Sequence, residues 1–436
     1  MDKNKVSTKK KKYSMEDINY PKWIYFLFSI FVAYMAVPLV DVPLLGLSLS
    51  APIFFFIALY VIFKTPKELF RPYKNWVILA IFIWLGTFLS AILNGLLSGG
   101  VNINSSGYLS IIRTAYWLVL LIITIIFSSQ HKVIKKVVYI LGFMSLILGL
   151  LRWLEVILFG ALGASGNTKW MSQNGYGFLF STFSPFLMVF VLKYTRWKRF
   201  FSGISLIALW SAVAINGSRG SWVAISVGVL VLLILLFTTK VKKFIGVFVG
   251  LSILVVAAVL ILAAIPQLTN TIVNRYDTFD QLSEDKSFVI RQLMNQKALR
   301  LFSNSPIIGV GPSRFRATSI ELDIPSILGY QDQSYFDTKS AHNSYLAYLA
   351  ETGLFGFIPF VVLLIILIFR GFTNTKYFLS KSQFWALAIY LSFIQTSIHM
   401  WVITALNNSG TWFIYGLTGA IIMLGQSEEQ KMEIQI

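Results

Sequence analysis

Long apolar stretches recur along almost the whole chain and are separated by short polar segments. A helix of roughly 18 or more mostly apolar residues is long enough to cross the hydrocarbon core of a bilayer. We predict twelve such helices, at 23–40, 46–63, 75–94, 109–127, 137–159, 175–192, 200–216, 222–239, 244–265, 350–369, 383–403 and 411–425. The pattern therefore predicts an all-α polytopic membrane protein. Pro52 interrupts the second window and the last window is short, so the pattern does not fix the ends of these two helices.

The composition agrees with lipid as the main solvent of this chain. Of its 436 residues, 56% are hydrophobic and 13% are charged, whereas soluble domains carry about 25% charged residues. An ordinary soluble domain is therefore excluded. The chain has no cysteine, which also excludes disulfides, thiol nucleophiles and thiolate metal sites.

The positive charge predicts how the chain is oriented. Lys and Arg number 37 against 18 Asp and Glu, which gives a net charge of +19. Most of the basic residues lie in the terminal tails and in alternate short loops, as expected for the cytoplasmic side of a membrane protein. Because this pattern accounts for the charge, nucleic acid is not a predicted partner.

This orientation divides the chain into five segments, with both termini cytoplasmic. They are a basic tail at 1–22, the first nine helices at 23–265, one large extracytoplasmic loop at 266–342, an interfacial helix with the last three spans at 343–425, and a second tail at 426–436.

The large loop is too long for a simple connection, and such loops are often functional. We expect one helix in it, from about 283 to 302. Ser283 is the predicted N-cap, acidic residues follow it in the first turn, and Ile290, Met294 and Leu301 form an approximate apolar stripe.

Ionisable residues within or beside the spans are costly in a membrane, so each suggests a function. Arg152 and Glu155 lie three residues apart and are expected to neutralise each other. Arg113 is as consistent with snorkelling to the head groups as with a functional role.

Arg219 stands in a turn of glycines and serines, residues 217–221. Exposed amides around a guanidinium predict an anion site, which we favour there.

His342 lies where the large loop returns to the membrane, and an imidazole at this position is a candidate general base. His399, inside a predicted span, is expected to be a neutral packing histidine that forms a hydrogen bond. The chain contains no histidine spacing typical of a metal site, so neither a metal nor another cofactor is expected.

Three short motifs in the second half of the chain together resemble the signature of the O-antigen ligase family, which includes bacterial polysaccharide polymerases. They cover about residues 205–360. The motifs are the turn Ser218-Arg219-Gly220, a loop helix with Arg291 followed by residues 305–312, and the string at 342–346 followed by Glu351, Gly353 and Gly356.

The resemblance implies transfer of a glycan from a polyprenyl (undecaprenyl) diphosphate donor to an acceptor hydroxyl, without a metal. The reaction takes place at the outer face of the cytoplasmic membrane of a bacterium, in cell-surface polysaccharide biosynthesis. It further implies that Arg219 and Arg291 bind the diphosphate and that His342 acts as the base.

The resemblance also suggests secondary positions in the site. Asn343, Arg314 and Arg113 are candidates for contacts with the donor or its glycan. Glu351 is expected to be structural. Residues 343–351 are expected to form a short interfacial helix that ends at Gly353 and holds His342 near the membrane surface.

Several alternatives stay open. A ligase and a polymerase differ only in the acceptor, which can be a glycan, a lipid or a protein. A flippase or transporter of lipid-linked oligosaccharides also needs about twelve helices, although transporters usually place their charges near the bilayer midplane. A structural or sensory membrane protein would not need Arg219, Arg291 and His342 to lie close together.

Overall fold

The computed structural model describes residues 18–36, 50–97, 105–160, 171–239, 285–329 and 333–435, and it contains only helices and turns within these ranges. The helices are α1 (Lys22–Ala36), α2 (Ser50–Lys64), η2 (Lys67–Tyr73), α3 (Lys74–Leu97), α4 (Ser105–Ser128), α5 (His131–Phe159), α6 (Gln173–Lys193), α7 (Arg196–Asn216), α8 (Arg219–Thr238), α11 (Lys286–Asn304), η3 (Ser326–Leu328), α12 (Gln333–Asp337), α13 (Ser344–Ser380), α14 (Phe384–His399) and α15 (Ser409–Gln435).

The prediction of an all-helical membrane protein is confirmed in its class. Every predicted window overlaps one of these helices, except the window 244–265. That window lies outside the described residues, as does the first part of the predicted loop, 266–284. In the described part of the chain, 7 helices are long and apolar enough to cross a membrane, whereas α1 and α2 are shorter. The number of twelve spans therefore stays a prediction.

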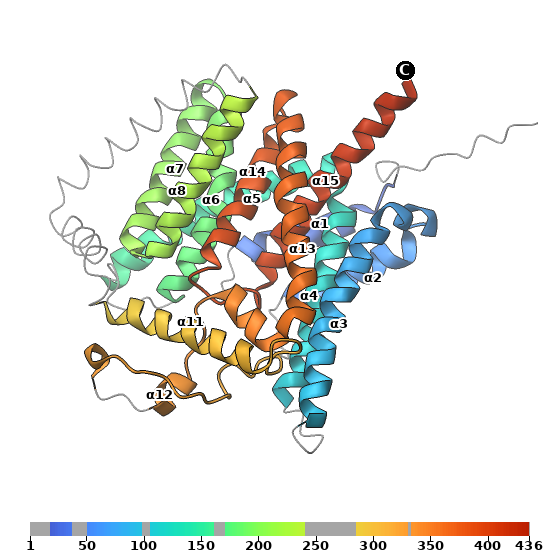
Figure 1. Cartoon of the computed structure of the whole chain (residues 1–436). Coiled ribbons are helices and arrows are strands. Elements are labelled where there is room, and N and C mark those ends of the chain that lie inside the picture. Colours follow the sequence, from blue (N-terminus) through green and yellow to red (C-terminus); the bar gives the residue numbers. More distant parts are fainter. Residues whose placement is uncertain are drawn as a thin grey trace, which may run out of the picture.

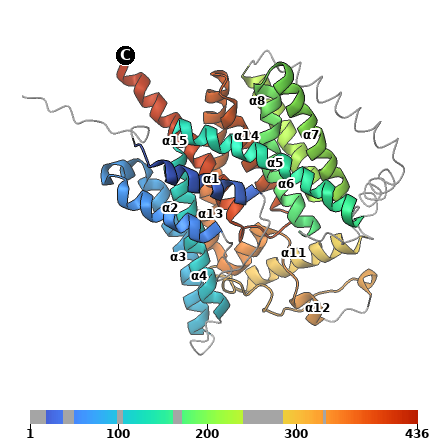
Figure 2. The same ribbon diagram turned by 180° about the vertical axis from the view of Figure 1, so that it is seen from behind.

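The helices pack into one bundle around an aromatic-rich core (Figure 1). On one side, α3 and α4 pack with α13 and α15, and on the other, α14 packs against α6 and α8. The view from behind shows α5 beside α6, with α1 across it (Figure 2). The predicted pair is confirmed inside the bundle: Arg152 Nη1 lies 2.9 Å from Glu155 Oε2, and both side chains are fully buried.

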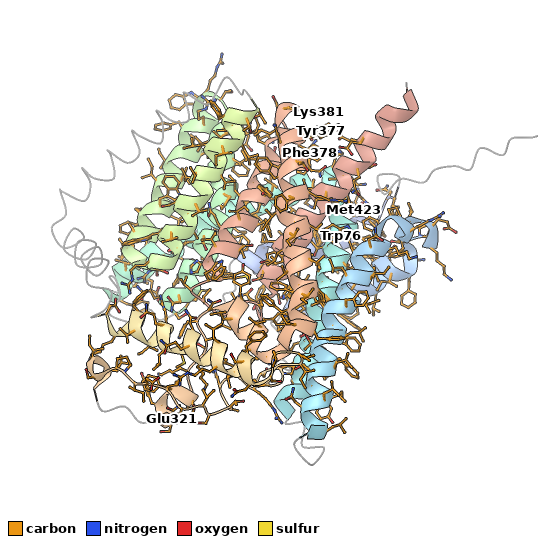
Figure 3. All side chains as sticks on the ribbon, viewed as in Figure 1. Trp76, Glu321, Tyr377, Phe378, Lys381 and Met423 are labelled. Atoms are coloured by element: carbon orange, nitrogen blue, oxygen red, sulfur yellow. The ribbon has the colours of Figure 1, made fainter. Side chains whose placement is uncertain are left out.

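Polar contacts hold α15 to its neighbours along the bundle. Trp76 Nε1 of α3 donates a hydrogen bond to Met423 Sδ at 3.3 Å, and Glu428 forms ion pairs with His131 of α5 and with Lys381 after α13. Figure 3 shows Lys381 and Glu321 at opposite ends of the molecule. The two loops that contain Lys381 and Glu321, which the charge pattern assigns to opposite sides of the membrane, thus lie at opposite ends of the molecule.

The described part of the predicted loop lies across the end of the bundle that carries Glu321, with α11 against α13 and α12 beyond it (Figure 1). It has an apolar core of its own, which includes Leu293, Phe315 and Phe336. Lys297, fully buried, lies 3.1 Å from Asp337 across this core. The loop is therefore a packed platform that faces the bundle.

Candidate functional site

Arg219 is the first residue of α8 and is held by an ion pair. Gly217, with φ of +66°, ends α7, and Ser218 leads into α8. Arg219 Nη2 lies 2.6 Å from Asp285 Oδ2, and both side chains are largely buried. Burial alone would raise the pKa of Asp285, but the hydrogen bonds from Arg219 and from the backbone of α11 outweigh it and hold this pKa below its ordinary value. The anion site predicted at this turn therefore already contains one carboxylate.

Asp285 also begins α11, which corrects the predicted start of that helix. Its Oδ1 accepts hydrogen bonds from the backbone N–H groups of Ser287 and Phe288, so Asp285 is the N-cap instead of Ser283. Ser283 itself lies outside the described residues. Asp285 is a cap and an ion-pair partner at once, and it therefore ties the start of α11 to the start of α8.

Close packing around the Arg219 turn involves α6 and α14. A Cβ atom on Gly220 would lie 2.4 Å from Val402 Cγ2 and 3.1 Å from His399 Nε2. His399 is 1% exposed, and its Nδ1 lies 2.8 Å from Ser181 Oγ. The expected packing histidine with a hydrogen bond is confirmed, and it lies directly against the turn.

Arg291 lies on α11, six residues after the cap, which places it about 9 Å further along the helix axis. Its side chain is partly buried. Its charge acts on the imidazoles of both His342 and His399. Arg291 therefore lies within electrostatic range of both imidazoles, on a helix that packs against α13.

His342 precedes α13 and has an unusual backbone, with φ of +50°. This conformation costs a non-glycine residue on the order of 1 kcal/mol, so its surroundings must hold it in place. The two following residues supply anchors. Asn343 Oδ1 accepts hydrogen bonds from the N–H groups of Tyr345 and Leu346, and the hydroxyl of Ser344 donates to the carbonyl of Ile403.

The imidazole of His342 is set up to stay neutral. Burial lowers its pKa from the ordinary value of 6.5, and the positive charges of Arg291, Arg316 and Lys339 lower it further. The ring forms no hydrogen bond with the described residues. At neutral pH it can therefore accept a proton.

The short helix predicted before the tenth span is confirmed. Gly353, with φ of 59° and ψ of −164°, breaks α13. The carbonyls of Pro306 and Ile307 accept hydrogen bonds from the N–H groups of Leu354 and Phe355 at 2.9 and 3.1 Å. Two chain segments far apart in sequence thus meet backbone to backbone at the break.

Glycines allow this crossing. A Cβ atom on Gly353 would lie 2.4 Å from the carbonyl carbon of Ile307, and one on Gly309 would lie 2.4 Å from the backbone of Glu351. Asn94 of α3 donates a hydrogen bond to the carbonyl of Gly309 at 3.0 Å. The crossing fixes the loop platform to the helix that begins beside His342.

Glu351 has the structural role expected from the sequence. Its Oε1 accepts a hydrogen bond from the backbone N–H of Phe315 at 3.2 Å. Its backbone carbonyl accepts a hydrogen bond from Ser90 Oγ of α3 at 2.8 Å. Glu351 therefore holds in place the segment that follows residues 309–312, the glycine loop.

The secondary candidates have different surroundings. Asn343 is 3% exposed and its side-chain oxygen is occupied by capping. Arg314 lies beside Gly311 in the glycine loop, with its Cδ at 3.0 Å from the Cβ position of that glycine. Arg113 is one turn after Ser110, whose hydroxyl forms a hydrogen bond with Ser313. Arg314 thus lies beside the glycine loop, and contact of Arg113 and Arg314 with a substrate stays a prediction.

Sequence reasoning missed two features near Arg291. Arg316 and Lys339 add positive charge around His342, but each follows an irregular segment whose course no periodicity predicts. Asn295 lies one turn after Arg291, and its buried Oδ1 has no hydrogen-bond partner in the described part of the chain. The only sequence signal for Asn295 is its spacing of four residues from Arg291, which places both residues on the same face of α11.

Taken together, α8, α11, α13 and α14 bring positive charge and a neutral imidazole to one end of the bundle. No group of three His, Asp or Glu side chains in the described ranges has the arrangement of a metal site. Comparison with known proteins matches residues 204–361 to the O-antigen ligase family, whereas no curated protein matches the chain. These residues include Arg219, Arg291 and His342. The family resemblance expected from the three sequence motifs is therefore confirmed for residues 204–361, which match the O-antigen ligase family.

Proposed function

We propose that this protein transfers an oligo- or polysaccharide from a polyprenyl (undecaprenyl) diphosphate donor to an acceptor hydroxyl at the outer face of the cytoplasmic membrane of a bacterium. The observation that carries the proposal is the place of His342 at the start of α13, within electrostatic range of Arg291 on α11, the helix that packs against α13. The family match supports a glycan-transferring membrane enzyme of the ligase or polymerase type.

In this reaction His342 removes the proton from the acceptor hydroxyl as the oxygen attacks the anomeric carbon of the donor sugar. The new bond joins the acceptor oxygen to that carbon, and the bond from the carbon to the diphosphate oxygen breaks. A neutral base is needed for this step, and a ring that is buried beside cations stays neutral at physiological pH.

The leaving polyprenyl diphosphate gains negative charge as the bond breaks, and Arg219 and Arg291 stabilise that charge. Asp285 fixes the orientation of Arg219 before the donor arrives, and a fixed cation costs little reorganisation during the reaction.

Replacing Arg291 by Gln is expected to lower kcat/KM for the lipid-linked donor by about tenfold to a hundredfold, because the positive charge that stabilises the leaving group is lost. Initial rates in detergent with purified protein measure this effect. Lys286→Gln is the matched control, since it removes an exposed cation from the same helix. Equal rates for the two variants would contradict the role of Arg291.

The pH dependence of transfer follows from the lowered pKa of His342. The rate is expected to be flat around neutral pH and to fall as the pH drops below the ordinary value of 6.5, through the lowered pKa, because protonation removes the base. In the Arg291→Gln variant this fall in rate is expected at higher pH, since one of the charges that lower the pKa of His342 is gone. If the fall occurs at the same pH in both proteins, Arg291 does not act on His342.

Deletion of the gene separates the possible functions. A ligase mutant accumulates lipid-linked polymer, a polymerase mutant accumulates single lipid-linked repeat units, and a flippase mutant has neither at the outer leaflet. Extraction of the lipid-linked glycans and separation by chain length distinguishes these outcomes. The proposal fails if neither polymer nor repeat units build up outside.

A further inference from the structure

The outer side of α11 carries a groove that the reaction itself does not use. The groove lies between α11 and the segment that includes Asp323 and Pro325, and its volume is about 350 Å³. This volume falls within the range of about 300 to 1,000 Å³ that is typical of small-molecule sites.

The polar lining of the groove comes largely from one stripe of α11. Gln292, Gln296 and Arg300 follow one another at intervals of four residues and are all exposed, so they stand on one face of the helix. Neither glutamine forms a hydrogen bond with the described residues. Each amide offers both donors and an acceptor, which is the combination that sugar hydroxyl groups require.

The charge of the groove is balanced. Arg300 Nη2 lies 2.6 Å from Asp323 Oδ2 at one end of it. The remaining walls include apolar surface from Leu299, which is 48% exposed, and from Pro325. A groove with a neutral balance, free amides and apolar walls suits a polyhydroxylated ligand better than an anionic lipid head group.

The same helix connects the groove with the site of transfer. Arg291 is partly buried and its charge acts on His342, whereas Gln292, the next residue, lines the groove. Gln296 and Arg300 lie about 7 and 13 Å further along the axis than Arg291. A glycan whose first sugar is held beside Arg291 therefore has a path along α11.

From these observations we infer that the groove binds the glycan portion of the lipid-linked donor, beyond the sugar that reacts. This inference rests on the proposed function for the identity of the ligand. Gln292 and Gln296 bond to sugar hydroxyl groups, and Leu299 and Pro325 pack against the apolar faces of the sugar rings. The groove thereby contributes to donor binding but not to the chemical step.

The test uses the full-length protein in nanodiscs and two measurements. The first is binding of oligosaccharide released by mild acid from the lipid-linked glycans of the producing bacterium. The double variant Gln292→Ala/Gln296→Ala is expected to bind it about tenfold more weakly, because two neutral hydrogen bonds are lost. Gln296→Trp, which fills the groove, is expected to have the same effect. Asn304→Ala, which removes an exposed amide outside the groove on the same helix, is the control and is expected to bind normally.

The second measurement is transfer from the lipid-linked donor. In the double variant KM is expected to rise about tenfold with kcat unchanged, and inhibition by bare undecaprenyl diphosphate is expected to stay as in the unsubstituted protein. If the double variant and Asn304→Ala bind the oligosaccharide equally well, the inference that the groove binds the glycan is overturned. If the unsubstituted protein binds the oligosaccharide but transfers none, the groove is supported and the proposed function fails. Binding of anionic lipid vesicles that depends on Gln292 and Gln296, in place of sugar binding, also overturns the inference.

Discussion

Replacing His342 by Ala is expected to lower the rate of glycan transfer by a factor of about 10² to 10⁴, the usual contribution of a general base. The substitution removes the neutral ring that accepts the proton of the acceptor hydroxyl. It breaks no hydrogen bond with the described residues, since the ring forms none there. The protein should therefore accumulate in the membrane at its normal level while transfer is lost. Transfer by purified protein, normalised to the amount in the membrane, measures the effect.

The control is another histidine, at the other end of the bundle. His131 Nε2 lies 3.0 Å from Glu428 Oε1, and a Gln at this position keeps a hydrogen-bond donor. His131→Gln should transfer glycan at the normal rate. Full activity of His342→Ala in protein that is present at the normal level would remove the base from the mechanism.

A second large effect is expected at Gly353, where the helix breaks. In Gly353→Ala the new Cβ atom would lie 2.4 Å from the carbonyl carbon of Ile307, and backbone atoms cannot move aside cheaply. The backbone conformation of Gly353 is also one that only glycine adopts readily. The free energy of unfolding of this variant should be lower by about 3 kcal/mol or more, and the variant should lose glycan transfer. The thermal midpoint in detergent and the rate of transfer measure the two effects.

Gly329 provides a close control for this substitution. Its φ of 72° and ψ of −165° resemble those of Gly353, yet nothing lies within 4 Å of its Cβ position. Gly329→Ala carries the same backbone strain without the collision. If both variants lose stability equally, backbone strain alone explains the loss. The close contact between Gly353 and Ile307 then adds nothing to the destabilisation.

Hydropathy was enough to predict the class of the fold. Long apolar windows become helices in a membrane because every backbone N–H and C=O group must then be bonded within the segment. The break at Gly353 was also predictable, since two glycines interrupt an otherwise apolar approach to a span. The pair Arg152 and Glu155 followed from helical spacing alone. These features all depend on residues that are close together in sequence.

Features that depend on distant residues could not be predicted in the same way. The sequence placed Asp285 within the first turn of a helix, but its ion pair with Arg219 joins positions 66 residues apart. The packing of His399 against Gly220 and the crossing of Gly309 with the backbone of Glu351 are of the same kind. The resemblance to a family indicated which residues matter, whereas hydrogen bonds and packing determine what orients them.

The apolar core of the loop platform has a consequence for the order in which the protein folds during synthesis. That core is completed by Ala347 and Ala350, which belong to α13. The ribosome releases α11 before α13, so Leu293 and Met294 lack part of their covering until α13 has been inserted. The loop expressed alone would therefore be an incomplete folding unit. Nascent chains that stop before residue 344 should expose this segment to envelope proteases although they already contain both arginines of the site.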